Sequence, residues 1–239
     1  MESWVTENVG FIGVGKFGAT QAARIAELRG VKSVGIGFED DLHSVKLPTD
    51  RKLVVTSDVD TKEDMQNGEL VAEEWQLKIK QFIITNYRNC SNFVILAGAG
   101  GGFGCGSILV VAEAIKMLLE ERGVGNAQDR TGIVLYMPNS EVASENSRKN
   151  AGYIATALHD VAKAGFVNPY IVVPWKDNVD SSSNFVVDLI EKNGEFISVM
   201  FVRYPHDEVV KQPRLSRLAN PPVAEANIPT AKKKNIYGE

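Results

Sequence analysis

The chain has 239 residues, of which 44% are hydrophobic and 23% are charged, and its formal net charge is −4. A chain of this length can bury one substantial core, or one core plus an appendage. The small net charge gives no electrostatic reason to expect nucleic acid or a membrane surface as the main partner. No apolar stretch approaches the roughly 18–20 residues that a spanning helix needs.

Short apolar runs alternate along the chain with stretches of helical periodicity. The apolar runs predict strands at residues 9–14, 34–38, 52–56, 93–97, 133–137 and 170–173. The helical patterns lie at residues 13–30, 70–87, 107–123, 144–164 and 181–200. The polar stretch SDVDTKEDMQNGE, residues 57–69, gives no clear element. This alternation predicts an α/β fold: a Rossmann-like parallel sheet with helices on both faces.

The last part of the chain has a different composition. Residues 212–239 hold four prolines, few large apolar side chains, and five Lys or Arg against two Glu. Such a segment cannot bury enough apolar area to offset its ordering entropy. We therefore predict one domain over residues 1–205 and an extended or disordered, proline-rich basic tail over residues 206–239. The tail would serve as a binding arm that orders against another subunit.

Cysteine and histidine usage indicates the compartment and excludes two kinds of site. Cys90 and Cys105 are too few for a disulfide scaffold. Three scattered histidines without a CxxC pair predict no metal site. The first ten residues lack the basic-then-apolar order of a secretory signal. We expect a cytoplasmic protein.

The first glycine-rich loop is GVGKFG, residues 13–18, a GxGxxG between a predicted strand and a predicted helix. Glycines let the backbone approach a phosphate closely, and the helix start offers free N–H groups. Glu39, after the second strand, would bond a ribose hydroxyl in an NAD(P) site. A lone GxGxxG also occurs as a tight turn with no ligand, so this loop by itself defines no function.

The second glycine-rich loop is more specific. AGAGGGFGCGS, residues 97–107, has six glycines among the nine residues from Gly98 to Gly106. It follows a buried strand and opens onto a helix, and ordinary turns need only one or two glycines. A run of this kind predicts backbone N–H groups that point into a concavity and bind an anion. It is not a P-loop, because no GK[ST] pair is present.

Both loops resemble those of the tubulin/FtsZ superfamily. FVILAGAGGGFGCGSILVVAEAIK is similar to the strand, glycine loop and helix of that family, and IGVGKFGATQA is similar to the FtsZ opening. The resemblance covers roughly residues 8–200 and implies the fold of the tubulin/FtsZ GTPase domain, followed here by the tail. In that family the loops hold the phosphates of GTP, with Mg²⁺, and the subunits polymerise head to tail.

The resemblance also implies residue roles at the phosphates. Gly13, Gly15 and Thr20 would line the first phosphate loop, and Lys16 would add a charge contact to a phosphate. The second phosphate loop would be formed by Gly100, Gly101, Gly102, Gly104 and Gly106.

For the sugar and the base, the implied residues lie later in the chain. Glu145, or alternatively Glu141, would bind the ribose together with Arg148. Asn178 would contact the base, and Phe185 would stack on it. A helix-surface Glu–Arg pair and a core phenylalanine remain the alternative interpretations.

The chain departs from the family pattern at two loop positions. Phe103 and Cys105 stand where the family has hydroxyl side chains that bond phosphate or magnesium-bound water. Phe103 is also expected to add bulk at the mouth of the site. Nothing after residue 200 resembles the acidic NxDxxD loop of the family's second domain. We therefore expect a truncated family member that does not hydrolyse GTP by itself.

These observations favour a structural or assembly role with GTP or GDP as the ligand and with the protein itself or other subunits as partners. A chain without the family's second domain would suit a phage variant of the family, located in the cytoplasm or in a viral particle. Two other hypotheses remain. One is an NAD(P)-dependent oxidoreductase that uses the first loop, and the other is a scaffold that binds no ligand.

Overall fold

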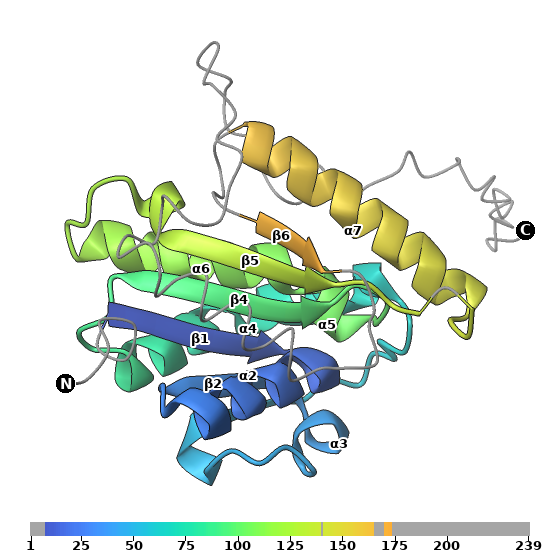
Figure 1. Cartoon of the computed structure of the whole chain (residues 1–239), viewed down its shortest axis with the longest axis horizontal. Helices are drawn as coiled ribbons and strands as arrows, with labels where there is room; N and C mark the ends of the chain where they lie inside the picture. Colours follow the sequence, from blue (N-terminus) through green and yellow to red (C-terminus); the bar gives the residue numbers. More distant parts are fainter. Residues whose placement is uncertain (1–7, 140, 165–169, 174–239) are drawn as a thin grey trace, which may run out of the picture.

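The computed structural model describes residues 8–139, 141–164 and 170–173. Its centre is a six-stranded, all-parallel sheet with the strand order β3-β2-β1-β4-β5-β6 (Figure 1). The strands are β1 (Val9–Val14), β2 (Ser33–Phe38), β3 (Lys52–Val55), β4 (Asn92–Gly98), β5 (Thr131–Tyr136) and β6 (Tyr170–Val173). The predicted Rossmann-like parallel sheet is confirmed. The expected 181–200 helix and the tail lie outside the described residues.

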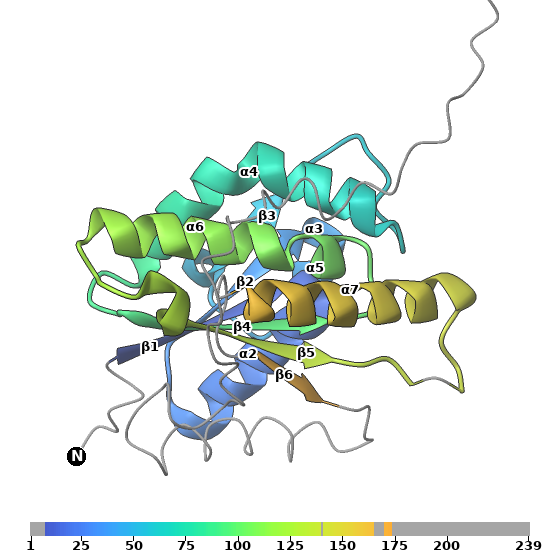
Figure 2. The ribbon, with the colours of Figure 1, turned by 90° about the horizontal axis from the view of Figure 1, so that it is seen from above.

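The helices cover both faces of this sheet (Figure 2). Helix α2 lies on one face, and α4, α6 and α7 lie on the other. Parallel crossovers are right-handed, so the connection from β1 to β2 and the connection from β4 to β5, which run in opposite directions along the sheet, place their helices on opposite faces. The helices are α2 (Gly15–Arg29), α3 (Glu39–Leu42), α4 (Met65–Asn86), α5 (Phe103–Gly106), α6 (Ile108–Glu121) and α7 (Glu145–Lys163), with 3-10 turns at Thr49–Arg51 and Ala127–Arg130.

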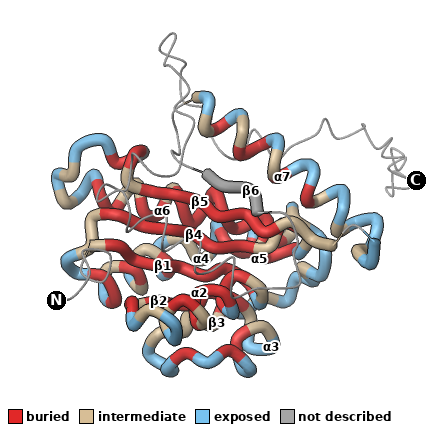
Figure 3. The backbone as a smooth tube through the Cα atoms, in the orientation of Figure 1, coloured by how far each residue is buried: buried red, intermediate tan, exposed pale blue. Residues whose placement is uncertain are grey.

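The main core fills the space between the sheet and the helices α4, α6 and α7, where the central strands are buried along their length (Figure 3). Each of the middle strands contributes a fully buried isoleucine to it, namely Ile12, Ile95 and Ile133. A second, smaller cluster joins α2 to the segment after β2 and includes Ala19, Ala23, Leu42, Val45 and Leu47. The alanines let α2 lie close to the strands.

Side-chain caps fix where two of the helices begin. The Asp64 carboxylate accepts a hydrogen bond from the Asn67 N–H at 2.9 Å and starts α4. The Ser144 hydroxyl accepts one from the Ser147 N–H at 3.0 Å and starts α7. Each cap satisfies an N–H group that the first helical turn leaves unbonded. Helix α4 therefore begins within the polar 57–69 stretch, five residues before the predicted start.

The end of α4 is tied to the amino-terminal edge of the sheet by Tyr87. Its hydroxyl donates to the Phe11 carbonyl at 2.6 Å and lies 3.2 Å from the Lys32 carbonyl. Its ring packs edge-on against Phe93, with centroids 5.8 Å apart. The Arg122 guanidinium donates to the Tyr87 carbonyl at 3.0 Å. This buried anchor stabilises the edge opposite the carboxyl ends of the strands.

We predict that Tyr87→Phe lowers the free energy of unfolding by about 1–2 kcal/mol, because a buried carbonyl loses its donor. Urea denaturation measures this change, with an unchanged slope showing that the folded state is preserved. Tyr153→Phe is the control, since the Tyr153 side chain is partly exposed on α7. Equal losses in both variants would contradict the role given to the Tyr87 hydroxyl.

Candidate nucleotide-binding site

The two glycine loops meet at the carboxyl edge of the sheet. β1 and β4 are neighbours, and their last paired residues are Val14 and Ala97. The strand order reverses between these two strands, because the chain leaves β1 toward β2 and leaves β4 toward β5. In open parallel sheets, ligands bind outside the carboxyl ends of the strands at such a reversal. Both loops therefore lie where the topology places a binding site.

The loops are in direct contact. Gly15, the first residue of α2, has a φ of +65°, a conformation that favours glycine. A Cβ on Gly15 would lie 2.8 Å from the Cα of Gly104. Glycine at both positions lets the first loop lie directly against the second, so that they form one continuous surface.

Residues Phe103–Gly106 of the second loop form the short helix α5, which leads through Ser107 into α6. The Gly106 N–H donates to the Gly102 carbonyl at 2.9 Å, and the Ser107 N–H donates to the Phe103 carbonyl at 3.0 Å. Within the described part of the chain, the N–H groups of Gly101, Gly102 and Phe103 have no hydrogen-bond acceptor. Unbonded N–H groups at a helix start favour an anion there.

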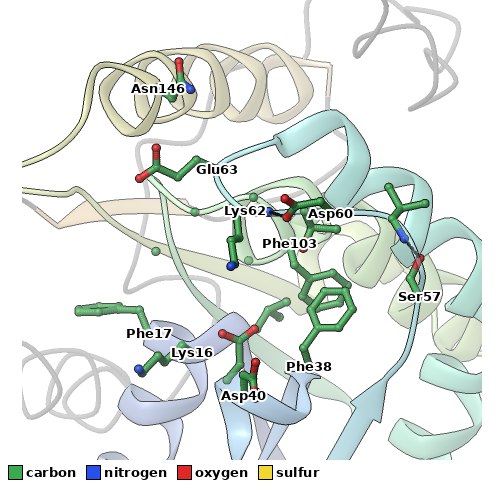
Figure 4. Close-up of a pocket in the computed structure, with 18 residues that line it drawn as sticks. Lys16, Phe17, Phe38, Asp40, Ser57, Asp60, Lys62, Glu63, Phe103 and Asn146 are labelled. Carbon is green, nitrogen blue, oxygen red and sulfur yellow. Dashed lines mark hydrogen bonds between the residues drawn. The ribbon is translucent and has the colours of Figure 1, made fainter.

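A pocket of about 780 Å³ opens over the loops (Figure 4). Its floor includes Gly101, Gly102 and Gly104, and its walls come from α2, from the end of β2, from α3, and from residues between 57 and 63. A smaller hollow of about 260 Å³ adjoins it on the β5 side and is lined by Phe17, Tyr136 and other residues. The larger pocket has the size of a small-molecule site.

Charged side chains of both signs line the larger pocket. Lys16 and Lys62 supply positive charge, and the carboxylates are Asp40, Asp41, Asp60 and Glu63. Burial raises the pKa of Asp41, and a backbone hydrogen bond from Phe38 and the charge of Lys16 partly offset this. Asp60 accepts a hydrogen bond from the Lys62 N–H at 2.9 Å, and Glu63 accepts one from the Ser144 hydroxyl at 2.7 Å.

The structure brings the predicted phosphate-loop residues together. Lys16, Gly101, Gly102, Phe103 and Gly104 line the larger pocket, and Gly100 lines the adjoining hollow. Gly13 lies near the end of β1, and Gly15 is the first residue of α2. Asn178 and Phe185 lie outside the described residues.

The sequence suggested that Phe103 adds bulk at the mouth of the site, and the structure shows that it does not. Its side chain is only 3% exposed. Its ring packs edge-on against Phe38, with centroids 5.3 Å apart (Figure 4). Phe103 therefore forms part of the pocket wall and does not protrude from the mouth of the pocket.

Cys105 and Gly106 lie behind the loop and are fully buried. The Cys105 thiol lies 3.2 Å from the Ala99 carbonyl oxygen, and burial raises its pKa. A thiol in this environment is neutral and is turned away from the pocket. Gly106 packs against the start of α4, beside Met65 and Gly68.

Thr20, Glu145 and Arg148 also lie away from the pocket. The Thr20 hydroxyl donates to the Lys16 carbonyl at 2.8 Å, and its side chain faces the outer surface of α2. Glu145 pairs with Lys149 at 2.6 Å, and Arg148 donates to the Ala143 carbonyl at 2.7 Å. These contacts place both side chains at the exposed start of α7, outside the residues that line the pocket, and their role at a ribose stays a prediction.

Other residues of α7 face the glycine loop instead. Asn146 lines the larger pocket, and Ser147 lines the adjoining hollow beside Gly100. The Asn150 amide donates to the Glu63 carbonyl at 3.0 Å and lies 3.4 Å from the Gly100 carbonyl. The spacing of the buried residues of α7 could have identified Ser147 and Asn150 from the sequence, and we did not use it. Ser147 and Asn150 lie four residues before the buried Ala151 and Ile154.

No family model and no curated protein matches this sequence. Solved structures do match. One is TubZ of Clostridium botulinum phage c-st, with a TM-score of 0.62, 13% identity, and coverage of 79% of this chain and 60% of that one. A CetZ protein from Haloferax volcanii, described as a GTPγS-bound protofilament, has a TM-score of 0.58, 19% identity, and coverage of 75% and 55%. An FtsZ mutant of M. jannaschii has a TM-score of 0.58, 21% identity, and coverage of 79% and 58%.

The fold and the pair of loops define an α/β protein built to place two glycine-rich turns at one edge of a parallel sheet. More particularly, the chain has the fold of the tubulin/FtsZ superfamily, as the resemblance of its loops predicted. It spans about 60% of the length of the TubZ structure that it matches.

We predict that Gly102→Ala lowers the free energy of unfolding by about 2 kcal/mol or more, because a Cβ there collides with the Thr61 carbonyl. Gly101→Ala is the matched control. A Cβ at Gly101 meets no atom within 4 Å, and we expect a change within about 0.5 kcal/mol. Urea denaturation of both variants measures the difference. Similar losses of unfolding free energy in the two variants would show that the collision with Thr61 is not the cause.

Proposed function

We propose that this pocket binds a guanine nucleotide, GTP or GDP, and that the protein has a structural role in an assembly. One observation carries the proposal: two glycine loops touch at the reversal point of the sheet and open into a single pocket of about 780 Å³. The loop N–H groups and the positive charges of Lys16 and Lys62 suit the phosphates.

The comparisons support this choice of ligand and role. The chain shares its fold with TubZ, CetZ and FtsZ structures, one of which is described as a GTPγS-bound protofilament. By analogy, subunits of this protein would associate with one another, with residues 206–239 as an arm that binds the neighbouring subunit. The cytoplasm or a viral particle is the proposed location. Within the described residues, no helix is long and apolar enough to cross a membrane.

We propose binding without turnover by this chain alone. At the two loop positions where the related loops carry hydroxyl groups, Phe103 and Cys105 are both packed into the core. Neither side chain offers an oxygen to a phosphate or to a magnesium-bound water. Mg²⁺ would take most of its ligands from phosphate oxygens and water. Asp40, which points into the cavity, is the candidate protein carboxylate (Figure 4).

A dinucleotide is the second candidate ligand. The strand order found here also occurs in NAD(P)-binding domains, and in those domains an acidic residue after the second strand binds the ribose. Asp41 follows β2 and lines the pocket, whereas Glu39, the residue expected from the sequence, is exposed at the start of α3 and is not part of the pocket lining.

We predict that GTP and GDP raise the melting temperature and that ATP and NADPH do not. A ligand at a hundred times its Kd adds about 2.7 kcal/mol to the free energy of unfolding. For a domain of this size the shift is roughly 5–10 °C. The measurement is a thermal-shift titration with and without Mg²⁺. A shift with NADPH alone would favour the oxidoreductase hypothesis, and no shift with any ligand would favour the scaffold.

We also predict that the purified full chain associates with itself when GTPγS is bound. Sedimentation of the protein at increasing concentration, with GTPγS and without nucleotide, measures the assembled fraction. Negative-stain electron microscopy then shows whether the pellet holds filaments, rings or particles. If the protein stays monomeric at every concentration while the nucleotide site is saturated, the proposed self-assembly is wrong.

A further inference from the structure

The outward face of helix α4 carries two exposed leucines that no described segment covers. Leu70 is 55% exposed and Leu77 is 68% exposed. The two residues are seven positions apart, so they lie on the same side of the helix, about two turns from each other. Helix α4 lies on the outside of the helical layer, with α6 beside it (Figure 2). Single exposed leucines are common at protein surfaces, so the leucines alone do not define an interface.

Carboxylates without a cationic partner accompany these leucines. Glu73 and Glu74 are exposed on the turn between them, and Glu69 precedes Leu70. None of the three carboxylates forms an ion pair with any residue within 8–139, 141–164 and 170–173. Nearer the end of α4, by contrast, the Lys80 ammonium group lies 2.6 Å from the Glu121 carboxylate of α6. Here the term α4 face means Glu69, Leu70, Glu73, Glu74 and Leu77.

Glu69 shows most directly that the α4 face lacks a cation. Its carboxyl group is half-buried, and burial together with the charge of Glu73 raises its pKa to about 7. Burial and the charge of Glu69 raise the pKa of Tyr153, so this partly exposed tyrosine of α7 lies near the α4 face. A cation beside Glu69 would favour its ionised form. The α4 face therefore suits a segment that brings positive charge together with apolar side chains.

Such a segment is present in the chain itself. Residues 212–218 read QPRLSRL, and they alternate two arginines, Arg214 and Arg217, with two leucines, Leu215 and Leu218. The segment has no acidic residue, and residues 212–239 as a whole carry five Lys or Arg against two Glu. Its charge is opposite to that of the α4 face, and its leucines match the exposed leucines there. Arginine also pairs with carboxylates through two parallel hydrogen bonds.

The chain is long enough to carry this segment to another subunit. Strand β6 ends at Val173, and the 40 residues from 174 to 213 lie between it and Arg214. A flexible chain of that length spans about 35 Å on average, roughly the width of a domain. In an assembly of touching subunits, the α4 face of a neighbouring copy lies within this reach.

We propose that the α4 face of one subunit binds residues 212–218 of a neighbouring copy. The inference rests on the proposed assembly role and names the surface that receives the arm. The two arginines pair with the carboxylates of the α4 face, and the two leucines pack on Leu70 and Leu77. Exposed ion pairs are individually weak. The contact is therefore weak for one arm and gains strength when it is repeated along an assembly.

The test is the binding of a fluorescently labelled peptide, residues 206–239, to the full chain, measured by fluorescence anisotropy without nucleotide. The unaltered chain should bind the peptide. A chain with Glu73→Lys and Glu74→Lys should bind it about tenfold more weakly, because attraction at two positions becomes repulsion. Both glutamates are exposed, so the fold tolerates the change. A peptide with Arg214→Glu and Arg217→Glu should lose affinity for the unaltered chain and recover it on the lysine-bearing chain.

The matched control is a chain with Glu27→Lys and Glu39→Lys. Both residues are exposed and lie outside the α4 face, on α2 and α3, and the change in net charge is the same. This chain should bind the peptide with an affinity within about twofold of the unaltered one, since distant exposed charges are screened. An equal loss in the control would show a general charge effect and overturn the inference. Unchanged binding by the Glu73→Lys, Glu74→Lys chain would overturn it as well.

The commitment to a neighbouring copy has its own test. If the peptide binds only to a full chain whose own tail carries Arg214→Glu and Arg217→Glu, each tail occupies its own subunit, and the commitment to a neighbour is wrong. If no chain binds the peptide, the inference is wrong altogether.

The assay contains no nucleotide, so it separates the inference from the function on which it rests. If the chain binds GTP and assembles while the α4 face does not bind the peptide, the inference is wrong and the proposed function stands. If the α4 face binds the peptide while the chain neither binds nucleotide nor associates with itself, the proposed function is wrong although the surface still receives the segment.

Discussion

The reversal of strand order between β1 and β4 is the constraint on which the site depends. Parallel strands end at the same edge, and right-handed crossovers send the chain from β1 to one side and from β4 to the other. No helix can therefore cover the edge between these two strands. The glycine loops that follow β1 and β4 are brought together there by the backbone alone, before any side chain of the pocket is considered.

The rest of the site is assembled by contacts between segments that are distant in the sequence. The segment between β3 and α4 lies on the second loop at Gly102. Helix α7 is tied to both through Asn150, whose amide lies within hydrogen-bond distance of the carbonyl groups of Glu63 and Gly100. Because the helix caps Asp64 and Ser144 begin α4 and α7 at this same edge, the two helices fix the walls of the pocket.

The sequence predicted the sheet well because its strands are uninterrupted apolar runs next to glycines, a pattern that few other structures produce. It also placed both glycine-rich loops, since their glycines are local signals. It did not show the phase of α7, which decides which side chains of that helix face inward. Glu145 and Arg148 match the expected chemistry, yet the stripe of Ala151, Ile154 and Leu158 turns them outward and turns Ser147 inward. Residues 57–63, which line the pocket, carried no local signal, because their position depends on the contact between Thr61 and Gly102.

The crowding around the second loop also bears on how this chain can change over generations. Gly102 and Gly106 are confined by neighbouring backbone, whereas Gly101 borders open space. Selection for a stable fold alone would therefore retain the first two glycines and leave the third free to vary. A lineage that had stopped binding a ligand would keep a loop that still looks glycine-rich, and the residue at position 101 would be the place to detect that loss.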